Sequence, residues 1–284
     1  IEITNGAKVA YRKLFNDIGA VNKWSVLTTP TALYFVDDEK KSLYSIGEGL
    51  NDLSNKFGFK KWVSDHISNK MWNPDNNSIL TLYDKSNGDV YFVGNNEALV
   101  YSESLGVFTS FMDYQDMAFL ENIDGVAITG MIKGYPESHT QNNLPIFKMF
   151  SGEYTNIFNE NRPYSLTFVS NENPLNDKIF NTVSWRNDMF DASDEYSSDP
   201  FSTFDSIRVT TANQDSGEVS LNLVQHGAGS NLKKKFNVFR AFIPREAGSR
   251  KRIRNPWAKI TLKKDASDDN KMMKFYDLSV EYTI

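Results

Sequence analysis

Five cations and a tryptophan lie close together in the stretch PREAGSRKRIRNPW, which runs from Pro244 to Trp257. They are Arg245, Arg250, Lys251, Arg252, Arg254 and Trp257. The planar guanidinium of arginine binds a carboxylate or a phosphate through two parallel hydrogen bonds. Pro244 and Pro256 bracket the run, and proline cannot donate to a strand ladder. We therefore predict a loop that joins the strands FNVFRAFI and WAKITLKK.

We predict that this loop faces protein. The carboxylates that could pair with it are Asp188, Asp191, Asp194, Glu195 and Asp199, on the same domain or on a neighbouring copy. A formal net charge of −5 opposes the approach of the whole chain to DNA. Two alternatives remain open: the guanidinium groups bind a phosphate backbone, or the loop is solvated and has no partner.

Carboxylates could also serve as the acid and base of a hydrolase. The candidates are Asp37, Asp38, Asp84, Asp89, Glu121 and Asp124. Each lies in or beside a predicted hairpin turn, where aspartate accepts hydrogen bonds from nearby backbone amides. The stretch SESLGVFTSF is similar to the Asp-box hairpin of sialidases, but Ser104 occupies its acidic position. The chain has no nucleophile elbow, P-loop or dinucleotide-binding glycine pattern, so we expect no enzyme.

Metal and cofactor sites are not expected either. The chain has no cysteine, and its three histidines, His66, His139 and His226, are far apart without ligand-like spacing. The acidic stretches DDEKK and DASDD do not match a calcium-binding loop. No apolar run approaches the ~18 residues of a membrane-spanning helix, so we expect no contact with a membrane.

Three similar hairpins are predicted in the first half of the chain. TALYFVDDEKKSLYSIG turns at Asp37 to Lys41, SILTLYDKSNGDVYFVG at Asn87-Gly88, and MAFLENIDGVAITG at Asp124-Gly125. Strand-forming residues flank polar turn residues in each case. The repetition indicates a mostly β fold.

A second unit follows each hairpin, and its turn glycines, Gly58, Gly106 and Gly152, are 48 and 46 residues apart. This spacing is typical of the four-stranded blades of a β-propeller. In the first copy Leu50, Leu53 and Phe57 have helical spacing, so a short helix could replace its third strand. Three blades do not close a ring. We therefore expect a partial propeller-like array, completed by further upstream blades of a longer polypeptide or by another chain; unrelated hairpins in a β-sandwich are the alternative.

The sequence predicts an N-terminal segment before the repeats and a separate domain after them. Residues 1–30 form an N-terminal segment with one short helix, which starts at Thr4 or Asn5 and stops at Gly19. The propeller-like repeats occupy residues 31–160. Residues 161–284 form a C-terminal β-sandwich with a jelly-roll-like arrangement, because their apolar residues alternate with polar ones.

Apolar and polar residues alternate along several predicted strands of the C-terminal domain. The residues predicted to share a buried face within each strand are Ile179, Val183 and Trp185; Ile207 and Val209; Val219, Leu221 and Leu223; Ala258, Ile260 and Leu262; and Tyr276, Leu278, Val280, Tyr282 and Ile284. Between these strands the acidic stretch RNDMFDASDEYSSDPFSTFD is predicted to be a long surface loop.

The stretches NPLNDKIFNTVSW, STFDSIRVTTANQDSGEV, IPREAGSRKRIRNPWAKITLKK and KFYDLSVEYTI together resemble the C-terminal part of the tail muzzle proteins of crAss-like phages. The hairpin array before them is similar to the propeller-bearing packaged-DNA stabilisation (tail hub) proteins of short-tailed phages. The resemblance covers roughly residues 31–284, and its most specific motif runs from Ile243 through Trp257.

This resemblance implies a structural component at the distal tip of a phage tail. Copies would ring the tail tip, help to close the DNA channel, and retain or release packaged DNA. The implied partners are other copies, other tail proteins and channel DNA without sequence specificity. The alternative is a carbohydrate-binding or glycosidase-like propeller, in which Trp62, Trp72 or Tyr83 would stack on sugars.

Overall fold

The computed structural model describes residues 2–284 except 5–7, 11–16, 68–78, 95–96, 113–116, 124–125, 132–145, 150–151, 158–159, 192, 194, 198, 200, 222–231 and 266–270. The described part is mostly β-strand, as predicted. The chain divides into two compact units, Ile1–Ser151 and Gly152–Ile284. The boundary predicted from the sequence lies between residues 160 and 161.

The first described residues form a hairpin where a helix was expected. Strand β1 (Glu2–Thr4) pairs antiparallel with β2 (Lys8–Ala10), so that Ile3 lies opposite Val9. The helix prediction is therefore wrong for residues 8–10, and residues 5–7 and 11–16 lie outside the described part. A short isolated helix is marginal in water, and the β-branched Ile3 and Val9 favour a strand pair.

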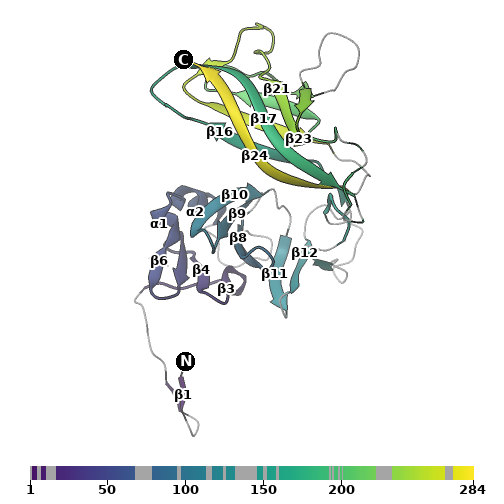
Figure 1. Ribbon diagram of the computed structural model, residues 1–284. Helices are drawn as coiled ribbons and strands as arrows, with labels where there is room; N and C mark the ends of the chain where they lie inside the picture. The colour runs from purple at the N-terminus through teal and green to yellow at the C-terminus, as the bar shows by residue number, and fades with distance from the viewer. Residues whose placement is uncertain are drawn as a thin grey trace, which may run out of the picture. The chain divides into compact units, whose positions relative to one another are not determined.

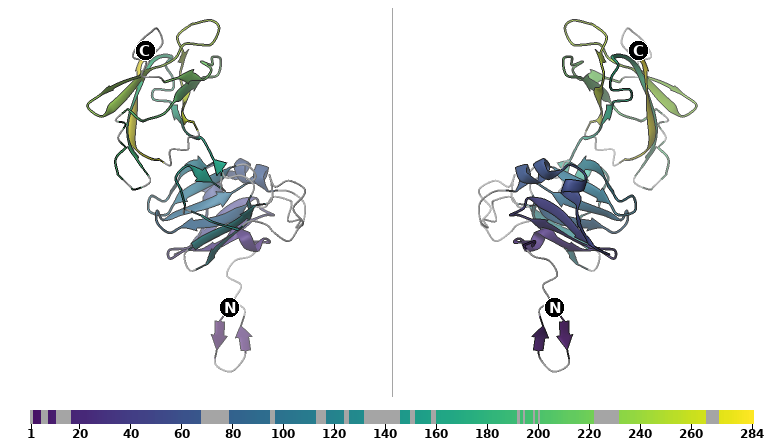
Figure 2. Two further views of the ribbon diagram at one scale, coloured as in Figure 1. Left: turned by 90° about the vertical axis from the view of Figure 1, so that its right-hand side faces the viewer. Right: turned by 90° about the vertical axis from the view of Figure 1, so that its left-hand side faces the viewer.

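Three antiparallel sheets follow in the first unit, each built from strands consecutive in sequence (Figures 1 and 2). The first contains β3 (Val26–Thr28), β4 (Leu33–Asp37), β5 (Ser42–Ile46) and β6 (Leu50–Asp52), and the second β7 (Leu80–Asp84), β8 (Asp89–Val93), β9 (Ala98–Ser102) and β10 (Val107–Met112). The third contains β11 (Met117–Ile123), β12 (Val126–Met131) and β13 (Ile146–Lys148). The three predicted hairpins, β4–β5, β7–β8 and β11–β12, are confirmed.

Two short helices stand where the first copy of the repeat departs from the second. Helix α1 (Leu53–Lys56) and helix α2 (Lys60–His66) follow β6. A short helix was predicted to replace the third strand, but that strand is present as β6, so the helices correspond in sequence to β10. Asp52 starts α1 by accepting a 2.9 Å hydrogen bond from the amide of Asn55. Gly58 separates the helices in a left-handed conformation, with φ of 78°.

The core of the first unit joins its first two sheets to its helices. Val36 and Leu43 come from the first sheet, Phe92 and Leu99 from the second, and Val63 from α2, and all five are buried. Strand β7 contacts both β3 and β11, so the three sheets lie beside one another through their first strands.

The second unit contains two larger antiparallel sheets. One has the strand order β16 (Tyr164–Ser170), β23 (Ala258–Lys264), β18 (Ser206–Thr210) and β19 (Val219–Ser220). The other has the order β20 (Leu232–Lys235), β21 (Val238–Phe242), β17 (Lys178–Phe190) and β22 (Arg254–Asn255), and β24 (Met272–Thr283) pairs with β17 along almost its whole length (Figure 1). A separate small pair, β14 (Asn156–Ile157) and β15 (Glu160–Asn161), precedes them.

One hydrophobic core lies between the two large sheets. Trp185 and Phe239 from one sheet and Ile207, Ile260 and Leu262 from the other are all almost fully buried. The predicted faces of β18 and β23 are confirmed, because Val209 and Ala258 also lie in this core.

Two predicted faces are wrong in part, because alternation breaks at register shifts. In β24, Leu278, Val280 and Tyr282 pack against the core as predicted. The pairing of β17 with β24 shifts between Phe180 and Thr182 and again between Arg186 and Asn187. At the first shift Phe180, and not Ile179, joins Val183 and Trp185 in the core. Beyond the second, Met273 and Phe275 pack against the core, while Tyr276 is 47% exposed; Ile284, at the chain's last position, is also exposed.

The acidic stretch 186–205 is not wholly the surface loop that was predicted. Its first residues, through Phe190, continue β17, and its last residues return to the core. The indole Nε1 of buried Trp185 donates to Thr203 Oγ1 at 2.8 Å and to Asn187 Oδ1 at 3.2 Å. These buried polar groups form hydrogen bonds with one another, so a polar stretch of sequence can lie in the core without unpaired donors.

Candidate interaction site

The segment 244–252 is called the cationic loop below. Backbone hydrogen bonds to β17 hold the residues on both sides of it. On one side the amide of Ile243 donates to Asn181 O at 2.9 Å, and on the other the amide of Phe180 donates to Ile253 O at 3.2 Å. Ile243 and Ile253 are both buried. The predicted loop between two strands is found. Arg254, however, lies outside it, in β22, opposite Ile179 of β17.

Hydrogen bonds within the cationic loop hold its backbone. The amide of Glu246 donates to Lys251 O at 2.9 Å, and the amide of Arg250 donates to Glu246 O at 3.1 Å. Arg245 Nη1 donates to Arg250 O at 3.0 Å. Arg250 has φ of 56°, a left-handed conformation in which a non-glycine residue is held by its surroundings.

Gln214 fastens the cationic loop to a neighbouring turn. Its Nε2 donates to Arg252 O at 3.2 Å and to Glu246 Oε2 at 3.4 Å, while its Oε1 accepts from the amide of Arg254 at 2.7 Å. Hydrogen bonds from Ser249 and Gln214 lower the pKa of Glu246. No sequence signal pointed to Gln214, because its partners lie more than thirty residues away along the chain.

The cationic side chains differ in their partners. Arg245, Arg250, Lys251, Arg252 and Arg254 are all exposed, whereas Trp257 is half-buried. Arg254 Nε lies 3.4 Å from Asp177 Oδ2. Within the described part of the chain, the guanidinium groups of Arg250 and Arg252 have neither a hydrogen bond nor an ion pair.

The carboxylates predicted to pair with the cationic loop lie at or beyond the end of β17 that is opposite the loop. Asp188, within β17, accepts from Tyr276 Oη at 2.8 Å and from Asn237 Nδ2 at 3.3 Å, and its hydrogen bond raises the pKa of Tyr276. Asp191 accepts from the Ser193 hydroxyl and the amides of Ser193 and Glu195, which lowers the pKa of Asp191.

The remaining predicted carboxylates belong to the same turn. Glu195 and Asp199 are exposed, and Asp199 Oδ1 accepts from the amide of Phe201 at 2.9 Å. Asp194 lies outside the described residues. Residues 191–199 are called the acidic turn below. Among the ion pairs of the described residues, none joins a predicted arginine to a predicted carboxylate.

The candidate acids of the first unit serve its turns. Buried Asp37 accepts from the amides of Lys40 at 2.8 Å and Gly19 at 3.1 Å. Buried Asp84 accepts from the amide of Ser86 at 2.9 Å and from Asn87 Nδ2 at 2.6 Å. Both carboxylates are occupied in holding hairpins, as turn chemistry predicts. The side chains of Glu121 and Asp124 lie outside the described part.

Of the aromatic residues predicted to stack on sugars, Trp62 and Tyr83 lie among the described residues, and Trp62 contacts other residues of the first unit. Trp62 Nε1 donates to Glu97 Oε1 at 2.7 Å, and its ring stacks on His66 with centroids 4.3 Å apart. Tyr83 is half-buried, and burial raises its pKa. Trp72 lies outside the described residues.

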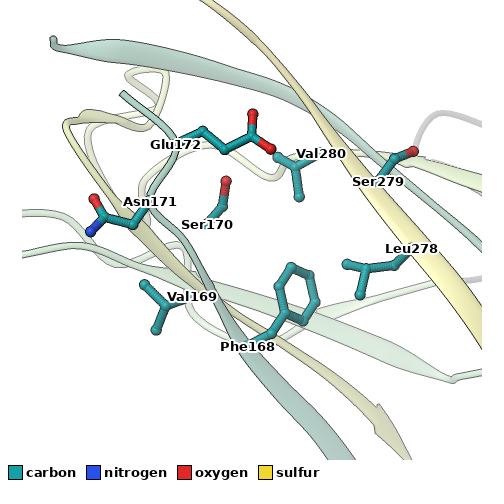
Figure 3. Close-up of a pocket in the computed structure, with 8 residues that line it drawn as sticks. All are labelled: Phe168, Val169, Ser170, Asn171, Glu172, Leu278, Ser279 and Val280. Carbon is teal, nitrogen blue, oxygen red and sulfur yellow. The ribbon is translucent and has the colours of Figure 1, made fainter. Parts of the chain in front are cut away.

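A groove of about 310 Å³ opens between β16 and β24 in the second unit (Figure 3). Its lining residues are Phe168, Val169, Ser170, Asn171, Glu172, Leu278, Ser279 and Val280. Glu172 is the one carboxylate among them, and its Oε2 accepts from Tyr282 Oη at 3.2 Å. A single carboxylate in a groove with a mixed polar and apolar lining does not provide the acid and base pair of a hydrolase.

Metal clusters and membrane-spanning helices can be judged for the described residues alone. These residues contain no cluster of three histidine, cysteine or acidic side chains that could hold a metal ion. They also contain no helix long and apolar enough to cross a membrane.

Comparison with known proteins gives matches along both units. A family model described as Crassvirus muzzle protein matches residues 1–129, and one described as Crassvirus muzzle protein C-terminal domain matches residues 152–246. The chain is 39% identical over 285 residues to the "Muzzle protein" of Bacteroides phage crAss001, an alignment that covers 99% of this chain. It spans 20% of that relative's length.

Proposed function

The chain belongs to the crassvirus muzzle protein family, and from this premise we propose that it helps to close the DNA channel at the distal end of the tail and to retain or release packaged DNA. As a muzzle protein it is a structural component of the virion tail. The observation that carries the proposal is the similarity to the muzzle protein of crAss001 over 99% of the chain. Because the chain spans a fifth of that relative, the role is proposed for this part alone.

The fold supports a propeller-like array in the first unit. Strands β4, β5, β8 and β9 are buried along nearly every residue, so both faces of these sheets are covered. Contacts of β7 with β3 and β11 bring the first strands of three successive sheets together, as at the inner rim of a propeller. We propose this arrangement for the first unit, and a jelly-roll-like sandwich for the second.

The proposed partners are other copies of the chain in a ring, other tail proteins, and channel DNA without sequence specificity. No membrane partner is proposed. The net charge of −5 supports protein partners and a channel that does not hold DNA tightly.

We propose no catalytic role. Asp37 and Asp84 are occupied in turns, and Asp89, whose pKa is raised by burial, lies at the start of β8 beside the second turn. A structural tail component also requires no turnover. A hydrolytic activity on capsular glycans that is lost on Asp84→Asn, with the fold kept, would contradict this.

The experiment that tests the function is localisation in purified virions. Gold-labelled antibodies raised against this chain should mark the end of the tail, and virions assembled without the protein should contain less DNA per particle. Labelling on the capsid, or full DNA content in particles that lack the protein, would contradict the proposal.

A further inference from the structure

We propose that the cationic loop of one copy binds the acidic turn of a second copy. This inference rests on the proposed function, because it names the surface through which copies of a tail component associate. It concerns the second unit, Gly152–Ile284, which contains both segments.

The two segments leave β17 at opposite ends within one copy. The cationic loop leaves the sheet beside Ile179 and Asn181, whereas the acidic turn follows Phe190 at the other end of β17. At about 3.3 Å per residue, the stretch from Ile179 to Phe190 spans on the order of 35 Å, several times the reach of an arginine side chain. Among the described residues, no ion pair joins the two segments within one copy, in agreement with this separation.

The backbone of the cationic loop is fixed before any partner binds. Bonds from Gln214 and within the loop fix its backbone, so that little conformational entropy is lost when Arg250 and Arg252 bind. Their guanidinium groups are exposed and, among the described residues, unpaired. A planar fork on a fixed backbone suits bidentate binding of carboxylates.

The acidic turn presents negative charge that matches the cations of the loop. Glu195 and Asp199 are exposed, and the described residues offer neither of them an ion pair. Among the described residues of the turn, Asp191 accepts from the amides of Ser193 and Glu195, and Phe190 forms a bridge with Tyr196. Lys234 and Lys274 lie near this end, and their ammonium groups sit over the rings of Phe239 and Tyr276.

A second copy is favoured over DNA as the partner because the same unit carries both charges. The second unit has 18 basic and 18 acidic residues, so it has no excess of cations to attract a duplex, whereas a second copy presents carboxylates directly. The contact joins two different surfaces, so each copy retains one free loop or one free turn unless the assembly closes.

The test uses two charge-reversal variants of the whole chain. One is Arg250→Glu with Arg252→Glu, and the other is Glu195→Lys with Asp199→Lys. By sedimentation velocity at low salt, wild type should self-associate, and each variant alone should show a dissociation constant raised at least about tenfold. An equimolar mixture of the two variants should associate again, because each supplies the charge that the other lacks.

A matched control reverses the charge of two exposed lysines outside the cationic loop, Lys60→Glu with Lys259→Glu. It should associate as wild type does. Circular dichroism and thermal melts verify that every variant is folded. Wild type that stays monomeric, a mixture that does not associate, or salt-dependent duplex DNA binding that requires Arg250 and Arg252 without self-association would each overturn the proposal. Virion localisation does not depend on this contact, so failure here leaves the proposed function standing.

Discussion

The strands of the two units are buried in different ways. In the first unit β5 and β9 are buried at almost every position, including the neighbours Leu99 and Val100. In the second unit β23 alternates, so that Ile260 is fully buried while Lys259 is exposed. A strand covered on both faces lies between other layers, whereas an alternating strand has one face in water.

The charged side chains of the two units also differ in their exposure. The described ion pairs that cross strands of the second unit, such as Arg186 with Asp277 and Arg240 with Glu281, lie on its wet faces with half-exposed side chains. In the first unit the carboxylates of Asp37 and Asp84 are instead buried in turns. Burial on both faces thus moves polar groups to the strand ends, where turn amides can satisfy them.

The largest expected effect tests this difference directly. In β8 both neighbours, Tyr91 and Phe92, are buried, so replacing either with alanine should lower the free energy of unfolding of the first unit by about 3–5 kcal/mol. In β23 Ile260→Ala should cost about 2–5 kcal/mol, whereas exposed Lys259→Ala should cost within about 0.5 kcal/mol. Hydrogen exchange resolved by peptide would follow each unit separately. Equal costs for Ile260→Ala and Lys259→Ala would break the comparison.

A smaller effect is expected at the turns. Asp37→Ala and Asp84→Ala each leave amide donors of a buried turn without a partner, so each should lower the free energy of unfolding of the first unit by about 1–3 kcal/mol. Asp215→Ala, which removes the half-exposed partner of Arg208 and of the Gly217 amide in the second unit, should cost less, because solvent reaches these groups. Chemical denaturation measures all three. A larger loss for Asp215→Ala than for Asp84→Ala would contradict the prediction.

Alkaline pH should act on the first unit through Tyr34. Burial and then its hydrogen bond to Glu103 raise the pKa of Tyr34 above the ordinary value of 10.0. Above pH 10 the unfolded chain loses this proton while the folded chain keeps it, so stability falls as pH rises. Tyr34→Phe should flatten this fall, as measured by hydrogen exchange of first-unit peptides at several alkaline pH values. An unchanged slope would show that Tyr34 does not titrate as described.

The smallest effect is expected in acid, in the second unit. Hydrogen bonds from Arg186 lower the pKa of Asp277, and those from Arg208 lower the pKa of Asp215. Their contribution is present above the unfolded pKa of about 3.9 and is lost as pH falls through the folded values. Melting temperatures of wild type and of Asp277→Asn should therefore converge below about pH 4, and high salt should reduce the difference at neutral pH. A constant difference down to the lowest pH would contradict this assignment.

The sequence predicted the hairpins more reliably than the ends of the molecule. The turns at Asp37 to Lys41 and at Asn87-Gly88 were found because turn chemistry is local. The family was also recognised from sequence, chiefly from the C-terminal stretches, and is confirmed. The helix predicted across residues 8–10 was wrong, because three strand residues take their conformation from a partner strand.

What the sequence alone determined is what local chemistry can specify: mostly β-strand, the hairpin turns, the buried positions of β23, and a loop of arginines between two strands. Only the tertiary structure decided where a register shift exchanges the faces of β17, since a bulge follows from pairing with β24 and not from alternation. Only the tertiary structure, too, set Gln214 against the cationic loop and separated that loop from the acidic turn by the length of β17. These relations join residues tens of positions apart, and packing between strands fixes them.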